Sequence, residues 1–273
     1  MDLLEHLDEL AGLIDGRMGL FVDFDGTISH LALTPDDAVV SHRAANALRG
    51  LSGKLPLVCA ISGRGVSNLR AKVGIDEIVY VGNHGVEKYE AESLVVAPGM
   101  AEYEERIVGL LSALKRHVDI PGIIWENKKY SAAVHFRATD HPASVKSALA
   151  EALSMVDEVD GLQMFWGKML LEIRIPNGVH KGDALRELVR EHRIDAAIFL
   201  GDDMTDLDAM KMLRDMREHD GLRGISAVVA DESTPEVLLS TADYTLDGVS
   251  SVETLLDWLL STSSGDSSTA QIA

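Results

Sequence analysis

The chain has little of three features that would each indicate a class of protein. It has 273 residues but one cysteine, Cys59, which excludes an internal disulfide and a zinc site built on cysteines. No apolar run approaches the roughly 18 residues that would span a bilayer. The 25 basic side chains are outnumbered by 44 acidic ones, giving a formal net charge of -19. That balance argues against a general nucleic-acid binder, which needs a basic face.

The rest of the composition is that of an ordinary globular protein. The hydrophobic share is 46%, enough to bury a core. Residues 1–16 are acidic and amphipathic, unlike a signal peptide. We therefore expect a soluble, cytoplasmic protein that acts as a monomer or weak homo-oligomer, with no nucleic-acid or membrane partner. If its substrate is anionic, local cations must overcome the negative field of the chain.

Short apolar runs alternate with helical patterns near both ends of the chain. Continuous apolar strands between helices predict βαβ units and a parallel sheet that is covered on both faces. The expected strands are residues 18–24, 55–63, 77–85, 195–203, 225–230 and 242–246, and the expected helices are residues 3–13, 36–53, 64–74, 180–192, 204–216 and 251–260.

The pattern changes after about Pro98. A long amphipathic helix at 100–118 is followed by strand-like pieces within 122–138. A further helix is expected at 143–156 and a hairpin at 162–175. Helices combined with hairpins form an α+β module, which does not continue a parallel sheet, so we expect an inserted second domain here.

The stretch DFDGT places Asp23 and Asp25 one residue apart, directly after an apolar strand. Two like charges in a partly dry place raise each other's pKa unless a cation lies between them. Asp23 is a candidate nucleophile, as carboxylates are in aspartyl-phosphate chemistry, and Asp25 a candidate proton-transfer group. The plain alternative is a turn rich in aspartate and glycine.

Two further motifs offer groups that bind phosphate. In ISGR, the Ser62 hydroxyl and the backbone N–H that follows it at Gly63 can hold a phosphate oxygen. The alternative for Ser62 is an N-cap of the next helix. In VHKGDAL, Lys181 can neutralise a phosphoryl group and the nucleophile carboxylate. The alternative for Lys181 is a solvated surface lysine.

A fourth motif, GDDMTD, follows the expected strand at 195–203. It supplies three carboxylates, Asp202, Asp203 and Asp206. Oxygen ligands with room for water suit Mg²⁺. Acidic capping of the next helix is the alternative, although a cap needs fewer acids. Because the carboxyl ends of parallel strands form the ligand crevice of an open α/β sheet, these motifs are expected to meet there.

In kind and in chain order, the four motifs resemble those of the haloacid-dehalogenase-like phosphohydrolases. The resemblance implies an α/β fold, a Rossmann-like parallel-sheet core with an inserted α+β cap domain. We expect the core at residues 1–97 and 174–261, the cap at 98–173 and a disordered tail at 262–273.

The same resemblance implies a role for each motif residue. Asp23 would be the nucleophile and Asp25 the general acid/base. Ser62, Gly63 and Lys181 would bind phosphate. The Mg²⁺ cofactor would be held by Asp23, the backbone carbonyl of Asp25 and Asp202, with Asp203 and Asp206 mainly supporting that site.

Three other stretches resemble the trehalose-6-phosphate phosphatases, namely residues 80–87, 125–137 and 170–185. They match that family's HG-x-E, E-x-K, VHYR and E-I-R-P patterns, with departures at Phe136, Ile175 and Leu207. The resemblance implies Mg²⁺-dependent hydrolysis of trehalose 6-phosphate to trehalose and phosphate through an aspartyl-phosphate, the last step of trehalose biosynthesis. The implied substrate-binding residues are Arg64, His84, Glu126, Lys128, Arg137, Glu172 and Arg174.

Alternatives remain open at this point. The substrate could be another sugar phosphate, of the sucrose or glucosylglycerate type, or the chain could be a catalytically silent module that regulates a partner synthase. Charge alternation normally means a solvated sheet face, here formed by Glu126, Lys128, Lys129 and Arg137. His84 could belong to a tight turn. Trp125 and Trp166 could stack on a sugar, although packing is the more common role.

Overall fold

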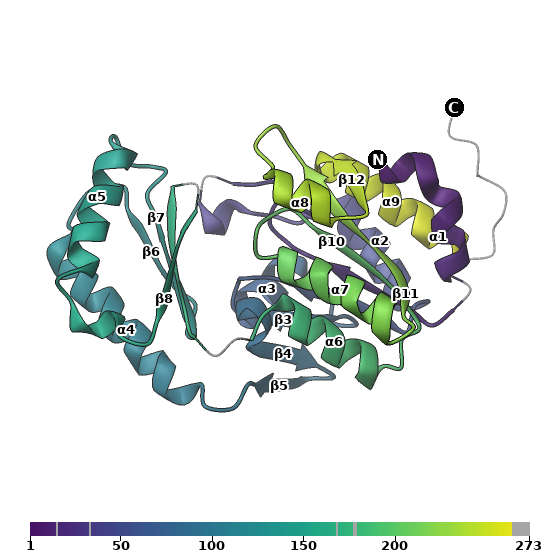
Figure 1. Ribbon diagram of the computed structural model, residues 1–273, viewed down its shortest axis with the longest axis horizontal. Coiled ribbons are helices and arrows are strands. Elements are labelled where there is room, and N and C mark those ends of the chain that lie inside the picture. The colour runs from purple at the N-terminus through teal and green to yellow at the C-terminus, as the bar shows by residue number, and fades with distance from the viewer. Residues whose placement is uncertain (15, 33, 168, 177–178, 264–273) are drawn as a thin grey trace. The chain divides into compact units, whose positions relative to one another are not determined.

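The computed structural model divides the chain into two compact units, each with its own sheet (Figure 1). The larger unit comprises Met1–Leu31, Ala38–Val95 and the chain from Val179 onward, and the smaller comprises Ala32–Asp37 and Val96–Gly178. The structure describes residues 1–14, 16–32, 34–167, 169–176 and 179–263. The tail predicted at 262–273 therefore lies outside the described residues from position 264.

The smaller unit differs from the predicted insertion at 98–173 because it also takes Ala32–Asp37. A hydrogen bond accounts for part of this, since Arg137 Nη1 donates to the Ala32 carbonyl at 3.3 Å. The predicted helix at 36–53 is shorter in the structure. Pro35–Asp37 form a short 3-10 turn, and the helix begins at His42, where the Ser41 side chain caps it.

The larger unit contains an eight-stranded sheet in the order β12-β11-β10-β1-β2-β3-β4-β5. The ladders from β12 to β3 are parallel, which confirms the predicted α/β core. β1 lies between β2 and β10, and because all three strands are parallel, the loops that follow them meet at one edge of the sheet. The strands are β1 Met18–Val22, β2 Leu57–Ile61, β3 Val79–Gly82, β4 Glu87–Glu90, β5 Ser93–Val96, β10 Ala196–Gly201, β11 Arg223–Ala230 and β12 Tyr244–Asp247.

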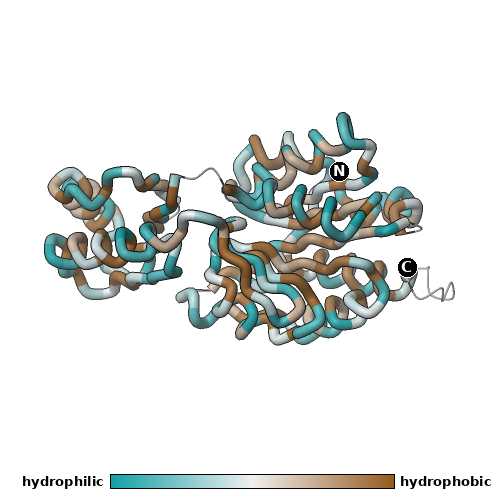
Figure 2. Tube along the Cα trace, turned by 90° about the horizontal axis from the view of Figure 1, so that it is seen from below, coloured by the Kyte–Doolittle hydropathy of each residue, from teal (hydrophilic) through white to brown (hydrophobic). Residues whose placement is uncertain are grey.

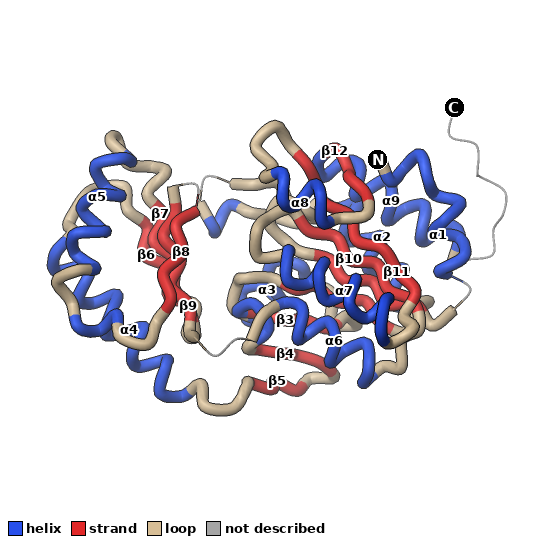
Figure 3. Tube along the Cα trace, viewed as in Figure 1, coloured by secondary structure: helices blue, strands red, loops and turns tan. Residues whose placement is uncertain are grey.

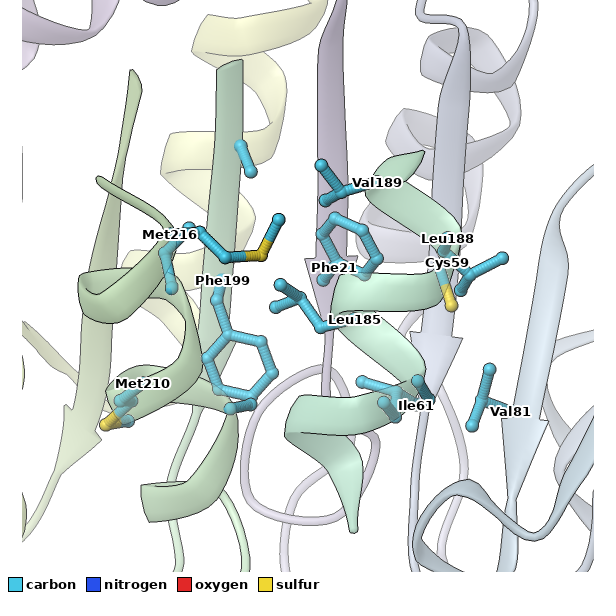
Figure 4. Packing of buried hydrophobic residues seen from close by; sticks show 14 of the residues in the cluster. Phe21, Cys59, Ile61, Val81, Leu185, Leu188, Val189, Phe199, Met210 and Met216 are labelled. Atoms are coloured by element: carbon cyan, nitrogen blue, oxygen red, sulfur yellow. The ribbon is translucent and has the colours of Figure 1, made fainter. Parts of the chain in front are cut away.

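Helices cover both faces of this sheet, so β1, β2 and β10 are buried along their whole length. On one face Phe21, Cys59 and Phe199 pack beneath Leu185 and Met210 of the covering helices (Figure 4). Figure 2 shows hydrophobic stretches running through the larger unit. The helices of this unit are α1 Leu7–Ile14, α2 His42–Ser52, α3 Val66–Val73, α6 Lys181–Glu191, α7 Leu207–His219, α8 Glu236–Thr241 and α9 Gly248–Thr262.

The smaller unit is a four-stranded antiparallel sheet in the order β6-β7-β9-β8, with its helices packed on one face (Figure 3). Its core alternates along the strands, so that Ala132 and Val134 face the helices while Ala133 faces the other way. In the described part of the chain, none of the helices combines the length and the apolar character that crossing a membrane requires. The elements are α4 Ala101–His117, α5 Pro142–Leu153, β6 Ile124–Asn127, β7 Ser131–His135, β8 Gln163–Gly167 and β9 Leu170–Arg174.

Candidate active site

Asp23 extends the central strand β1 into the loop edge of the sheet. Its backbone N–H donates to the Leu200 carbonyl at 2.8 Å, and its side chain is buried. The loop that follows turns at Gly26, whose φ is +74°. A Cβ at Gly26 would overlap the Asp202 carboxylate. Glycine at this position therefore allows the loop after β1 to lie directly against the loop after β10.

Lys181 points into the same edge from the first residue of α6. His180 and Asp183 form a capping box that fixes the start of this helix. The ammonium Nζ donates to Asp23 Oδ1 and to Asp206 Oδ1, each at 2.7 Å. Because the residue is only 1% exposed, the alternative of a solvated surface lysine is wrong.

Asp206 is held entirely by donors of the protein. Its Oδ1 accepts from Lys181, and its Oδ2 accepts from the backbone N–H groups of Asp202 and Asp203 at 2.9 and 3.1 Å. Asp206 therefore fixes the backbone of the loop after β10 through its bonds to Asp202 and Asp203. Asp203 turns the other way, with Oδ1 accepting from the backbone and hydroxyl of Thr205.

The carboxylates of Asp23, Asp202 and Asp206 form a group that could hold a metal ion. One oxygen from each lies within 4.8 Å of the others. With Lys181 paired to two of them, the ionised group carries two uncompensated negative charges, the charge that a divalent cation balances. Carboxylate oxygens are hard ligands, and they suit Mg²⁺, Ca²⁺ or Mn²⁺ rather than a soft metal. Asp203 lies outside this group.

Burial and mutual repulsion shift the titration of these residues. Desolvation raises the pKa of Asp23 well above its usual value, and Asp206 and Asp203 raise it further against the pull of Lys181. Desolvation and the Asp23 charge likewise raise the pKa of Asp202. Burial would lower the pKa of Lys181, but Asp206 and Asp23 raise it above the ordinary lysine value. Lys181 is therefore a permanent cation, whereas the carboxylates need a further positive charge to ionise together.

Ser62 and Gly63 follow β2 at the same edge. The Ser62 side chain is buried, and its Oγ accepts from the Arg64 backbone N–H at 3.3 Å. The N-cap of α3 is Gly65, not Ser62, so the alternative of a capping serine is wrong. Helix α3 is instead capped by Glu87, whose Oε2 accepts from the Val66 N–H at 3.0 Å. The HG-x-E pattern contained Glu87, but the sequence did not reveal this role.

The structure brings Arg64 to Asp25. The guanidinium grips both carboxylate oxygens, with Nε to Oδ2 and Nη2 to Oδ1 each at 2.7 Å. Its Nη1 donates to Asn68 Oδ1 at 3.0 Å, and the residue is 5% exposed. Such a two-point pair fixes the orientation of a carboxylate as well as its charge. Arg64 was expected among the substrate-binding residues, and the structure pairs it with Asp25, the expected acid/base.

His84 lies in a strained turn beside the Ser62 loop. Both Asn83 and His84 have positive φ, 48° and 59°, so glycine is not the only residue here in the left-handed region. The turn is held by Asn83 Nδ2 donating to Glu87 at 2.7 Å and by the His84 N–H donating to the Ser62 carbonyl at 3.1 Å. The imidazole packs on Gly63, where a Cβ would come within 2.5 Å of it. The His84 ring thus packs against the loop that carries Ser62 and Gly63.

A second set of expected residues gathers in the smaller unit. Lys128 Nζ lies 3.9 Å from both Glu126 and Glu172, and Glu126 also contacts His135 at 2.9 Å. Arg174 pairs with Glu172. The side chains of Lys128 and Glu172 are each 11% exposed, so this is a packed network and not a solvated face. Arg137 lies apart from it, exposed and bonded to Ala32.

The structure also contains a second group of possible metal ligands, Glu90, Glu191 and His192. Lys88 Nζ donates to Glu191 Oε2 at 2.6 Å, and His192 Nε2 lies 2.9 Å from Glu90 Oε1. These partly exposed side chains therefore satisfy one another, and we assign them no metal.

Known proteins resemble this chain in sequence and in fold. Residues 21–250 match the family model described as trehalose-phosphatase. The chain is 29% identical to trehalose-phosphate phosphatase B of Arabidopsis thaliana, over 94% of this chain and 70% of that protein. It is 30% identical to the trehalose-phosphate phosphatase of Mycobacterium marinum, over 86% of this chain and 63% of that protein. The chain thus spans about two thirds of the length of these relatives.

Solved structures share the fold at lower identity. The C-terminal domain of the trehalose-6-phosphate phosphatase of Candida albicans superimposes with a TM-score of 0.72 at 22% identity, covering 92% of this chain and 95% of that one. The C-terminal domain of a trehalose synthase regulatory protein of Candida albicans does so with a TM-score of 0.68 at 12% identity, covering 94% and 97%. The fold alone therefore does not separate an enzyme from a regulator, but the family match over residues 21–250 is decisive for kinship: the chain belongs to the trehalose-phosphatase family.

Proposed function

We propose that this chain hydrolyses trehalose 6-phosphate to trehalose and phosphate. The observation that carries the proposal is the buried pairing of Lys181 with Asp23 and Asp206, with Asp202 alongside, at the loop edge of the sheet. A structural ion pair needs no third carboxylate, whereas a phosphoryl-transfer site needs a nucleophile, cationic donors and metal ligands together. Kinship with the trehalose-phosphatases supports the substrate.

The proposed reaction divides between two carboxylates. Asp23 attacks phosphorus and forms an aspartyl-phosphate as the bond to the sugar oxygen breaks, while Asp25 donates a proton to that oxygen. Asp25 then accepts a proton from the water that hydrolyses the aspartyl-phosphate, which releases phosphate and regenerates Asp23. Lys181 holds the nucleophile in place and balances charge on the phosphoryl oxygens, to which the Ser62 hydroxyl and the Gly63 N–H also donate.

Magnesium is the metal that we propose for the carboxylate group. Asp23, Asp202 and the backbone carbonyl of Asp25 would hold it, Asp206 and Asp203 would support the loop, and Mg²⁺ would supply positive charge at the phosphoryl oxygens. The same proposal places the enzyme in the cytoplasm, where a single buried cysteine stays reduced, as a monomer or weak homo-oligomer.

Recognition of the sugar is proposed for the polar face of the smaller unit, which would act as the cap. Glu126, Lys128 and Glu172 present a charged network on one face of its sheet, and disaccharide hydroxyls can exchange hydrogen bonds with such groups. Arg174 belongs to the same network, and His84 would contact substrate from the larger unit. Arg137 lies apart from this network and donates to the Ala32 carbonyl.

The three departures from the family pattern bear little on the substrate. Phe136 is 2% exposed in the core of the smaller unit, Ile175 is 7% exposed, and Leu207 is 8% exposed at the start of α7. Side chains buried this deeply contribute packing and offer nothing to a bound sugar. They therefore give no reason to prefer a sucrose or glucosylglycerate phosphate.

The test of substrate is a panel of sugar phosphates. We expect phosphate release from trehalose 6-phosphate with Mg²⁺ and a loss of it in excess EDTA. We also expect kcat/KM at least about tenfold lower for sucrose and glucosylglycerate phosphates, since two lost hydroxyl contacts together cost about 2 kcal/mol. The measurement is phosphate release at matched ionic strength. A higher kcat/KM for another ester would overturn the substrate, and no release from any ester would favour the silent regulatory module.

A role for Arg64 follows from its grip on Asp25. We expect Arg64→Met to lower kcat for a sugar phosphate by about 10²-fold, because the misaligned acid no longer protonates a poor leaving group. An aryl phosphate, whose leaving group needs no proton, should lose far less. Asn68→Ala is the control, since it removes a partner of Arg64 and leaves the pair with Asp25 intact. Equal losses on both esters would show that Arg64 does not act through Asp25.

A further inference from the structure

An aromatic side chain lies on the polar face of the smaller unit. Phe165 in β8 pairs with Glu172 of β9, Glu172 with Ala133 of β7, and Ala133 with Glu126 of β6. Because side chains at paired positions point to the same side of a sheet, these residues form one row across its four strands. Phe165 therefore shares a face with the charged network and lies next to Glu172.

The neighbouring tryptophans point the other way. Trp166 pairs with Leu171 and contacts the buried Phe136 edge-on, and Trp125 packs against the helices. Lys146 of α5 lies over the Trp166 ring. Both tryptophans are thus engaged in packing, and Phe165 supplies the aromatic surface on the opposite side.

The Phe165 ring is both exposed and oriented. Phe165 is 43% exposed. It lies on the face of the sheet opposite the hydrophobic core of this unit. The guanidinium of Arg174 lies over it, 4.7 Å from the ring centroid, and Arg174 is itself paired with Glu172. A cation–π contact of this kind holds the ring against the sheet and leaves the rest of its surface to solvent.

We propose that Phe165 is a further substrate-binding residue, a platform on which a pyranose ring of the substrate stacks. One face of a pyranose presents C–H groups and its rim presents hydroxyls, so an aromatic ring beside a carboxylate and a guanidinium matches both. Glu172 and Arg174 would then bind the rim hydroxyls while Phe165 covers the apolar face. This inference rests on the proposed function, because it takes the substrate to be a sugar phosphate.

The test compares Phe165→Ala, Phe165→Leu and Phe165→Tyr with the wild type. We expect the alanine and leucine variants to raise KM for trehalose 6-phosphate about tenfold with kcat unchanged, since a stacking contact made equally in ground and transition states alters only binding. The tyrosine variant should keep the wild-type KM. Trp166→Ala is the matched control from the other face of the same strand, and its KM should not change.

Binding in an inactive background separates this inference from the proposed function. With Asp23→Asn throughout, titration calorimetry should show about tenfold weaker binding of trehalose 6-phosphate when Phe165 is replaced by alanine or leucine, and no change for acetyl phosphate, which has no sugar. An active wild type whose Phe165→Ala or Phe165→Leu variant binds as tightly would overturn the platform alone. An inactive wild type that still binds the sugar phosphate through Phe165 would overturn the proposed reaction alone. If the wild type neither hydrolyses nor binds it, both are wrong.

Discussion

Asp23→Asn is expected to abolish turnover while leaving the protein folded. The amide cannot attack phosphorus, so kcat should fall at least about 10³-fold even if substrate still binds. The packing of β1 should survive, because asparagine keeps the size of the side chain and an oxygen that can accept from Lys181. Phosphate release under saturating substrate and Mg²⁺ measures the first effect, and thermal unfolding measures the second.

The same variant should be more stable than the wild type in metal-free solution. Desolvation and the neighbouring acids raise the pKa of Asp23 in the folded protein, so the folded state binds more protons than the unfolded state above about pH 4. The free energy of unfolding of the wild type therefore falls as pH rises from that point through the folded-state pKa. The amide of the Asp23→Asn variant carries no such charge, and the stability advantage of this variant in EDTA should grow as the pH rises above about 4.

Asp25→Asn is the matched control for this stability effect. It also removes one carboxylate from the motif, but Asp25 is gripped at two points by Arg64 and its side chain is 36% exposed. Removing its charge breaks a favourable pair, so no gain in stability is expected. Activity like that of the wild type in Asp23→Asn would disprove the nucleophile. A stability change that is equal in the two variants would disprove the electrostatic account of Asp23.

The sequence predicts the parallel core well because its strands are buried on both faces. Such strands read as continuous apolar runs, and each of β1, β2 and β10 carries its motif at the next residue. The short strands β4 and β5 were missed for the opposite reason. Glu87–Glu90 reads EKYE and gives no apolar signal. Ser93–Val96 reads SLVV, which is apolar, but four residues are a short run, and this strand is largely exposed at the edge of the sheet.

The contacts of the site were harder to predict than its residues. Arg64 and Asp25 are joined across separate loops, and no local pattern indicates which carboxylate a guanidinium will meet. Two adjacent aromatic residues in β8 posed a similar difficulty. Because side chains alternate along a strand, Phe165 and Trp166 must lie on opposite faces of the sheet. Only the register of β8 against β9 determines which of them shares a face with Glu172.

Lys181 is expected to contribute more to stability than any surface lysine of the chain, as well as being required for turnover. Its ammonium is hydrogen-bonded to two buried carboxylates, Asp23 and Asp206. In Lys181→Met these acids would be left buried without compensation. Breaking a buried pair by removing one partner costs about 3–5 kcal/mol, so the free energy of unfolding at pH 7 in EDTA should fall by about that amount.

Lys88→Met provides the control, because Lys88 also pairs with two carboxylates. Its partners Glu187 and Glu191 are 62% and 44% exposed, so water replaces the lost pairs and the cost should stay below about 1 kcal/mol. Adding Asp206→Asn to Lys181→Met should restore part of the lost stability, because one of the two stranded charges is then gone. Urea unfolding of the four proteins, the wild type included, measures these differences. Similar losses in the free energy of unfolding for Lys181→Met and Lys88→Met would mean that Asp23 and Asp206 are stable in the folded protein without a cation. This edge of the sheet would then have no need of a cation.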